Sequence, residues 1–278
     1  MAESVTPFRT RRLRSVLLTL VAALLLALVF YAGSIALVDT AYLTGWVLFA
    51  VILMLAFFNL RKRLTYPPLL KAATWLRLHV YLGCLAVLVF AFHTRMQIPT
   101  GALEVTLYLL FVALAASGFV GLYLSRTIPN SLADRGNEVI FERIPRFRRE
   151  LGERMQALVL AAVETEAAFI LSDFYRDRLH AYLAGPTDYW AHLIRSTRPR
   201  ELLLHELHEL RRYLSDGEIA VAEEIAEIIR LKYDLDFHYV RQGLLKIWLF
   251  IHIPLTWVLL LFLLAHIVIV YAFAGIFA

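Results

Sequence analysis

Two stretches of sequence decide the fold: HVYLGCLAVLVFAFH at residues 79–93 and HIPLTWVLLLFLLAH at residues 252–266. Both are almost entirely apolar, and each carries a histidine at both ends, 14 residues apart. At about 100° per residue, this spacing returns to nearly the same face of an α-helix, about 21 Å further along its axis. Two such helices side by side are therefore expected to present two stacked pairs of imidazoles.

The whole chain has the composition of an integral membrane protein. Of its 278 residues 60% are hydrophobic, the mean hydropathy is +0.66, and the apolar runs are longer than a soluble core needs. We predict an all-α fold with a bundle of five transmembrane helices. The first of them has a longer apolar core than a signal peptide and is interpreted as an uncleaved anchor. The predicted spans are Ser15–Val38, Tyr42–Leu60, Leu76–Phe92, Leu103–Leu124 and Ile247–Phe273.

A polar insert separates the fourth span from the fifth. The predicted division is therefore residues 1–125 for the amino-terminal tail and four spans, 126–246 for the insert, and 247–278 for the last span. The insert holds 18 Lys and Arg against 20 Asp and Glu, so it is close to neutral. Apolar residues at helical spacing over 201–213 and 218–233 predict a helical hairpin, whose second helix continues toward the fifth span.

The basic residues fix an orientation. They cluster before the first span, after the second and after the fourth, and the positive-inside rule makes all three sites cytoplasmic. The insert is then cytoplasmic, the carboxyl terminus is outside, and the expected location is the cell (inner) membrane. The clusters are Arg9, Arg11, Arg12 and Arg14; Arg61, Lys62 and Arg63; and Arg126, Arg143, Arg146, Arg148 and Arg149.

This topology tests the histidine pattern. The third and fifth spans both run outward, so His79 lies level with His252 near the inner surface, and His93 lies level with His266 near the outer one. Ionisable side chains at membrane depth are costly and are functional candidates. Because two facing neutral imidazoles close a six-coordinate haem iron, we predict two haem b groups, an inner one on His79 and His252 and an outer one on His93 and His266.

Two further residues are predicted to contact the cofactors. Gly83 shares the helix face of His79 and leaves room for a flat macrocycle. Arg95 is the one basic residue expected outside and is the predicted partner of the outer haem propionates. The alternatives stay open: a small residue also permits close helix contact, and a terminal arginine also serves as an interfacial anchor.

In the spacing of these four histidines, the chain resembles membrane cytochromes b with two bis-histidine haems. These are the cytochrome b of quinol:cytochrome c reductases and the haem domain of ferric reductases and NADPH oxidases. The resemblance covers about residues 75–271 and implies the same ligation on two parallel helices. A ferric reductase or NADPH oxidase would continue into a sixth span and flavin and nicotinamide domains, so a separate electron donor is expected here. The insert is also larger than expected, and no quinone-site motif is recognised.

The expected function is electron transfer across the bilayer through two stacked haems. The chain would be an electron-transfer subunit of an oxidoreductase complex, without catalytic residues of its own. A redox partner would dock on the insert, and a periplasmic cytochrome or another acceptor would lie outside. Two alternatives remain open, a quinol-linked cytochrome b membrane anchor that binds quinone and a non-redox transporter or sensor that uses the histidines.

We assign no function to three other features of the sequence: its net charge, its cysteine and the histidine pair at 205 and 208. The formal net charge of +5 is assigned to cytoplasmic loops rather than to nucleic acid. Cys84 is the one cysteine, which excludes a disulfide within the chain. His205 and His208 share a helix face, but that helix has the composition of a solvated surface and is not assigned to a metal.

Overall fold

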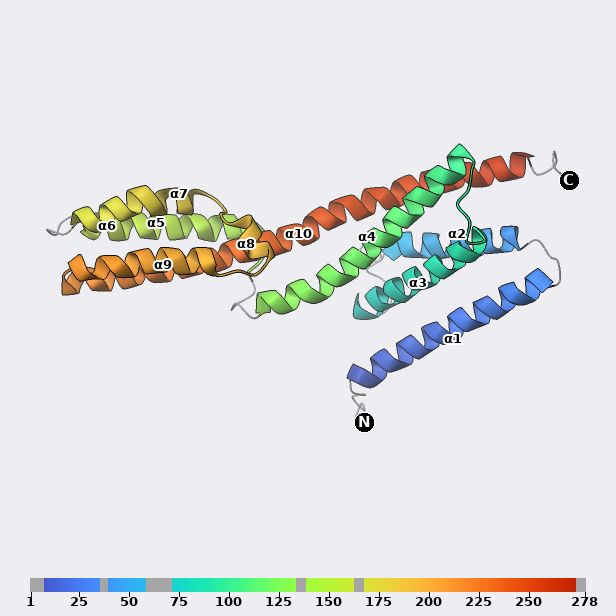
Figure 1. Ribbon diagram of the computed structural model, residues 1–278, viewed down its shortest axis with the longest axis horizontal. Coiled ribbons are helices and arrows are strands. Elements are labelled where there is room, and N and C mark those ends of the chain that lie inside the picture. Colours follow the sequence, from blue (N-terminus) through green and yellow to red (C-terminus); the bar gives the residue numbers. More distant parts are fainter. Residues whose placement is uncertain (1–7, 36–39, 59–71, 134–138, 163–167, 274–278) are drawn as a thin grey trace, which may run out of the picture. The chain divides into compact units, whose positions relative to one another are not determined.

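The computed structural model describes residues 8–35, 40–58, 72–133, 139–162 and 168–273. Within these ranges all regular secondary structure is helical, so the all-α prediction is confirmed. The chain divides into two compact units, one of residues 1–122 and 250–278 and the other of residues 123–249. Helices α4 and α10 each contribute residues to both units (Figure 1).

The first unit contains helices long and apolar enough to cross a membrane. Four such helices, α1, α3, α4 and α10, occur in the described ranges. Helix α2 has 16 residues, fewer than the roughly 20 that span a bilayer. Its predicted end at Leu60 and the basic cluster at 61–63 lie outside the described residues, so the second of the five predicted spans, Tyr42–Leu60, stays a prediction. The bounds are α1 (Phe8–Ile35), α2 (Ala41–Ala56), α3 (Ala72–His93), α4 (Ala102–Ala133) and α10 (Asp216–Phe273).

The outer faces of these helices are apolar. Leu24 of α1 is 61% exposed, and Leu261 and Val268 of α10 are each 67% exposed. Each Å² of apolar area left in water costs the folded protein about 25 cal/mol of free energy that burial would have contributed. The helices are therefore compatible with a lipid environment.

The buried core of the first unit lies halfway between the two histidine levels. Ala86 of α3 is seven residues from both His79 and His93, and Leu259 of α10 is seven residues from both His252 and His266. Both residues belong to one apolar cluster. Its buried members are Leu48 and Ile52 of α2, Ala86 and Val89 of α3, Phe111 of α4, and Leu259 and Leu260 of α10.

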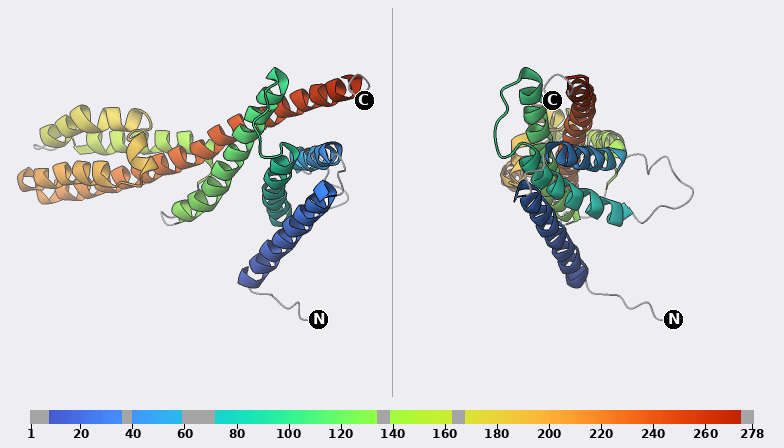
Figure 2. Two further views of the ribbon diagram at one scale, coloured as in Figure 1. Left: turned by 45° about the vertical axis from the view of Figure 1, so that its right-hand side comes forward. Right: turned by 90° about the vertical axis from the view of Figure 1, so that its right-hand side faces the viewer.

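The second unit confirms the predicted hairpin. Helix α9 is followed by a 3-10 turn, and α10 begins at Asp216. The Glu218 carboxylate accepts hydrogen bonds from the Ser215 N–H (2.8 Å) and hydroxyl (2.7 Å), which caps the start of α10. Figure 2 shows α5 and α9 alongside the first half of α10. The bounds are η2 (Phe141–Arg143), α5 (Ile144–Ala162), α6 (Ala168–Phe174), η3 (Tyr175–Leu179), α7 (His180–Ala184), α8 (Tyr189–Leu193), α9 (Arg198–Leu210) and η4 (Arg211–Tyr213).

A buried ionic cluster ties the loop before α8 to α10. Asp236 and Lys232 are both fully buried, and the Lys232 Nζ lies 2.5 Å from an Asp236 carboxylate oxygen. The second oxygen lies 3.3 Å from the Arg148 Nε. The Thr187 N–H donates a 3.1 Å hydrogen bond to Asp236, and Lys232 donates a 3.0 Å hydrogen bond to the Thr187 hydroxyl. Asp236 is therefore shared by three other residues.

Candidate functional site

The four histidines form two pairs across helices α3 and α10. His79 and His252 are close enough to interact electrostatically, and so are His93 and His266. These are the two pairs that the sequence analysis puts at equal depth. Since the core cluster lies halfway between the ends of both stretches, the two pairs lie on opposite sides of it.

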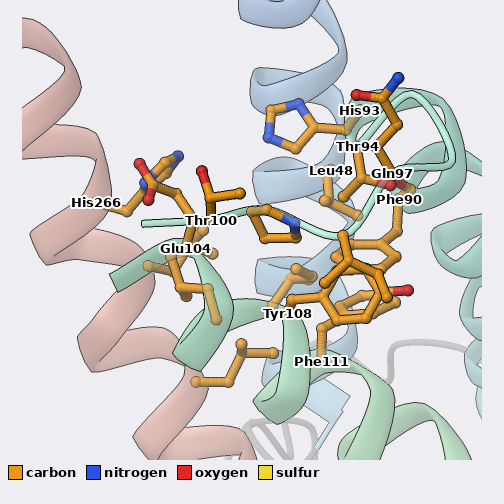
Figure 3. A pocket seen from close by; sticks show the side chains of 16 residues that line it. Leu48, Phe90, His93, Thr94, Gln97, Thr100, Glu104, Tyr108, Phe111 and His266 are labelled. Carbon is orange, nitrogen blue, oxygen red and sulfur yellow. The ribbon is translucent and has the colours of Figure 1, made fainter. Parts of the chain in front are cut away.

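A pocket of about 350 Å³ opens between the members of the outer pair. Figure 3 shows His93 and His266 lining it from two different helices. Its walls are mostly apolar, and its volume falls in the range of roughly 300–1,000 Å³ that small-molecule and cofactor sites have. The apolar lining comprises Leu48, Ile52, Phe90, Ile98, Pro99, Leu107, Phe111, Leu259 and Leu263.

The ring of His93 is oriented by a neighbouring helix. The Thr44 hydroxyl oxygen of α2 lies 3.1 Å from the His93 Nδ1 and 2.9 Å from the carbonyl oxygens of Thr40 and Ala41. A hydroxyl has one proton. When that proton goes to a backbone carbonyl, the Thr44 oxygen accepts from the His93 Nδ1–H, and the lone pair of the ring then lies on Nε2. That tautomer can ligate a metal ion through Nε2.

His252 has a matching partner on α4. The Ser117 hydroxyl oxygen lies 3.1 Å from the His252 Nδ1. In both cases a glycine follows the hydroxyl residue and faces the same ring. A Cβ at Gly45 would lie 3.1 Å from the His93 Cε1, whereas a Cβ at Gly118 would lie 4.0 Å from the His252 Cε1. The contact at Gly45 is therefore the tighter of the two.

The ring of His79 packs differently. It lies 4.9 Å from the Phe58 ring between centroids. The backbone carbonyl of Leu55 faces it, but the buried Nδ1 of His79 makes no hydrogen bond of regular geometry. Helix α2 therefore contacts both histidines of α3, with a hydroxyl at the outer one and the end of the helix at the inner one.

The two residues predicted to assist cofactor binding lie apart from the pocket. Among the described residues, a Cβ added at Gly83 would meet no protein atom within 4 Å. Arg95 is exposed in the turn after α3, with a positive φ of 52°. Neither residue lines the outer pocket.

Polar residues of the outer pocket were missed in the sequence analysis. They come from the loop after α3 and from the first two turns of α4. The loop contributes Thr94, Gln97 and Thr100, and α4 contributes Glu104 and Tyr108. The Thr100 hydroxyl and the Gln97 amide can donate hydrogen bonds to an anionic group at this end of the pocket, whereas the Thr94 hydroxyl donates to the Phe90 carbonyl oxygen. A usable signal was the spacing of Glu104, Tyr108 and Phe111, which places them on one face of α4.

The remaining histidines lie in the second unit. His205 and His208 are exposed on α9, and His192 and His238 are buried in packing. Within the described ranges, no group of three or more His, Cys, Asp or Glu side chains could hold a metal ion. A bis-histidine haem needs only two protein ligands.

The residues at the outer pair fit a haem. Two histidines from different helices, one of them with its Nδ1 within hydrogen-bond distance of a hydroxyl, line a pocket with apolar walls and polar groups from the α3–α4 loop and the start of α4. At the inner pair, His79 and His252 are the residues that would hold such a group. Comparisons of the chain with protein-family models, with curated proteins and with solved structures gave no match.

Proposed function

We propose that this chain is a membrane electron-transfer protein that holds two b-type haems, one between His79 and His252 and one between His93 and His266. The observation that carries the proposal is the pairing of imidazoles across α3 and α10 at two levels. Two accidental pairs with the same spacing on both helices would be a costly arrangement in a bilayer.

The residues of the chain would hold and tune the cofactors. A pair of bis-histidine haems supplies one-electron transfer over the distance between the irons. Thr44 and Ser117 lie at the Nδ1 atoms of His93 and His252, and in this role they would fix ring orientation and ligand basicity. The apolar cluster around Ala86 and Leu259 would exclude water between the two levels.

The proposal includes a topology and partners. Helix α2 belongs to the second of five membrane-crossing segments, and the amino terminus and residues 126–246 face the cytoplasm of a cell whose inner membrane holds the protein. A redox partner delivers electrons at the insert, and an extracytoplasmic acceptor such as a cytochrome receives them. Support for this arrangement comes from the basic clusters and from the four apolar helices.

The test is the optical spectrum and haem content of the purified full-length chain. We expect a reduced-minus-oxidised spectrum of b type and two haems for each chain. His79→Ala and His252→Ala should each remove the same haem, and His93→Ala and His266→Ala should each remove the other. Electron paramagnetic resonance of the oxidised protein distinguishes the two sets, because each low-spin haem has its own signal.

The matched control is His205→Ala, since His205 is exposed on α9 and belongs to neither pair. It should keep both haems. A wild-type chain that is folded, as judged by its helical circular dichroism, but incorporates no haem contradicts the proposal. So does a set of variants in which His79 and His252 affect different haems.

A further inference from the structure

The short helix α8 presents an apolar surface beside basic residues. Trp190 is 81% exposed, Ile194 is 75% exposed and Tyr189 is 48% exposed. Arg195 and Arg198, both exposed, follow directly. We call these five residues the α8 surface. Aromatic, aliphatic and arginine side chains together are typical of segments that lie in the interface of a membrane.

The inner side of α8 is fixed firmly to α10. The buried His192 ring lies 4.4 Å from the Tyr233 ring between centroids. Arg241 donates a 3.3 Å hydrogen bond to the Leu193 carbonyl oxygen, and the Tyr233 hydroxyl donates a 2.6 Å hydrogen bond to the Ser196 carbonyl oxygen. These contacts with α10 fix the position of the α8 surface within the second unit.

The backbone on both sides of α8 is in a costly conformation. Asp188 has a φ of 54° and Arg195 has a φ of 60°, a region in which glycine is favoured. The Ser196 N–H closes the helix by a 2.8 Å hydrogen bond to the Ala191 carbonyl oxygen. Arginine therefore occupies a position that glycine would occupy at lower cost.

The α8 surface also lies near the level at which α10 becomes apolar. Its neighbour Arg241 is six residues before Ile247, where the predicted span begins, which is about 9 Å along the helix. Tyr233, which also contacts α8, lies 14 residues before Ile247, about 21 Å along the helix. The headgroup layer of a bilayer is about 5 to 8 Å deep on each side, so the end of α8 beside Arg241 is the part that comes near it. Figure 1 shows α8 beside the middle of α10, away from α6 at the far end of the same unit.

Two exposed arginines and one exposed acid, Asp188, flank this surface, and the excess of positive charge suits an acidic partner. Arg195 is close enough to Arg241 for their like charges to interact, and Arg198 lies three residues further along the chain. The cytoplasmic leaflet carries anionic phospholipids, whose phosphates attract basic residues within about 10 Å. We propose that the α8 surface rests on acidic phospholipid headgroups, with Trp190 and Ile194 inserted at the interface, and that it fixes the insert against the membrane.

The experiment uses the full-length chain with Cys84→Ser, because Cys84 is its one cysteine. A spin label is placed at Trp190→Cys, Ile194→Cys or the control Phe169→Cys, whose side chain on α6 is 79% exposed. Each protein is reconstituted in nanodiscs of phosphatidylcholine alone or mixed with phosphatidylglycerol. Power saturation then compares collisions with oxygen, which concentrates in lipid, with those of a water-soluble nickel chelate.

We expect the ratio of oxygen to nickel accessibility at 190 and 194 to be several-fold above that at 169, and to rise further with phosphatidylglycerol. Arg195→Gln combined with Arg198→Gln should abolish that rise at 194. Labels at 190 and 194 that are as water-accessible as the control in both lipids overturn the proposal. Low collision rates with both reagents also overturn it, because they indicate that protein covers the surface. Haem content does not enter this measurement.

Discussion

The Thr44 hydroxyl oxygen lies 3.1 Å from the Nδ1 of His93 and 2.9 Å from two backbone carbonyl oxygens. When the hydroxyl proton goes to one of these carbonyls, the Thr44 oxygen accepts a hydrogen bond from the imidazole. Hydrogen bonds of this kind at a histidine that binds a metal raise its basicity and fix its ring. Thr44 is fully buried, which makes the interaction stronger than it would be in water.

The first prediction follows from this contact. Thr44→Val keeps the shape of the side chain but removes the acceptor, so the His93 ring loses orientation and electron donation. We expect haem affinity at the outer site to fall about 10-fold or more and the midpoint potential of the outer haem to rise. Redox titration of the purified protein measures the potential, and haem titration measures the affinity.

Thr44→Ser is the control for this prediction, because it keeps a hydroxyl at the same place. It should leave the outer potential close to that of the wild type. An unchanged potential and affinity in Thr44→Val would show that the hydroxyl does not act on a ligand of iron.

The second prediction compares two glycines. A methyl group at Gly45 would lie 3.1 Å from the His93 Cε1, so the ring must shift, whereas at Gly118 it would lie at 4.0 Å, an ordinary contact. Gly45→Ala should weaken the outer haem by about an order of magnitude without affecting the inner one. Gly118→Ala should keep both. Haem content and low-spin signals of the two variants distinguish these outcomes, and equal losses in both would contradict the geometric argument.

The fold was largely predictable because the signals in the sequence are strong. Apolar runs of membrane length and the turn at residues 215–217 follow from hydropathy and helix capping, and the structure contains the corresponding helices. The Ser215 and Glu218 spacing is a capping pattern visible in the sequence. Hydropathy does not identify α2 as a span in the same way, because its 16 residues suit a buried helix as well as a membrane helix.

The surroundings of the histidines could not be predicted to the same extent. Thr44, Gly45 and Ser117 lie on helices that carry no histidine, and a single sequence does not show which faces of different helices meet. The assistance predicted for Arg95 rested on closeness to His93 in the sequence. In the structure Arg95 is exposed in the turn after α3, and Gln97 and Thr100 of the following loop line the pocket. The contact of Arg95 with the haem propionates stays a prediction.

The third prediction concerns the buried cluster around Asp236. Asp236 is contacted by Lys232, Arg148 and Thr187, so Asp236→Asn leaves two cations without their shared anion. We expect the insert to lose about 3 to 5 kcal/mol of stability. Lys232→Met should cost less, because Arg148 still pairs with Asp236. The two losses of stability are compared by unfolding the full-length chain with urea in detergent, with proteolysis of the insert as the readout. A larger loss in Lys232→Met than in Asp236→Asn would contradict the prediction.

The last prediction is a pH dependence of the insert. Burial, followed by the charge of Asp236, raises the pKa of the Tyr182 phenol far above its ordinary value. In the unfolded chain this phenol ionises near pH 10, while the folded one keeps its proton. The folded state then binds more protons, so the free energy of unfolding should fall as pH rises above about 10, by up to about 1.4 kcal/mol per pH unit.

Tyr182→Phe isolates this effect. The variant loses the 3.1 Å hydrogen bond from Tyr182 to the Ile229 carbonyl oxygen, which should cost about 1 kcal/mol at neutral pH, but its stability should no longer fall above about pH 10. Burial lowers the pKa of Lys232, so Lys232 acts in the opposite direction and is unchanged by the substitution. Thermal unfolding followed by circular dichroism between about pH 8 and 11 measures the difference. Parallel curves for Tyr182→Phe and wild type would mean that the phenol ionises as readily in the folded protein as in the unfolded chain.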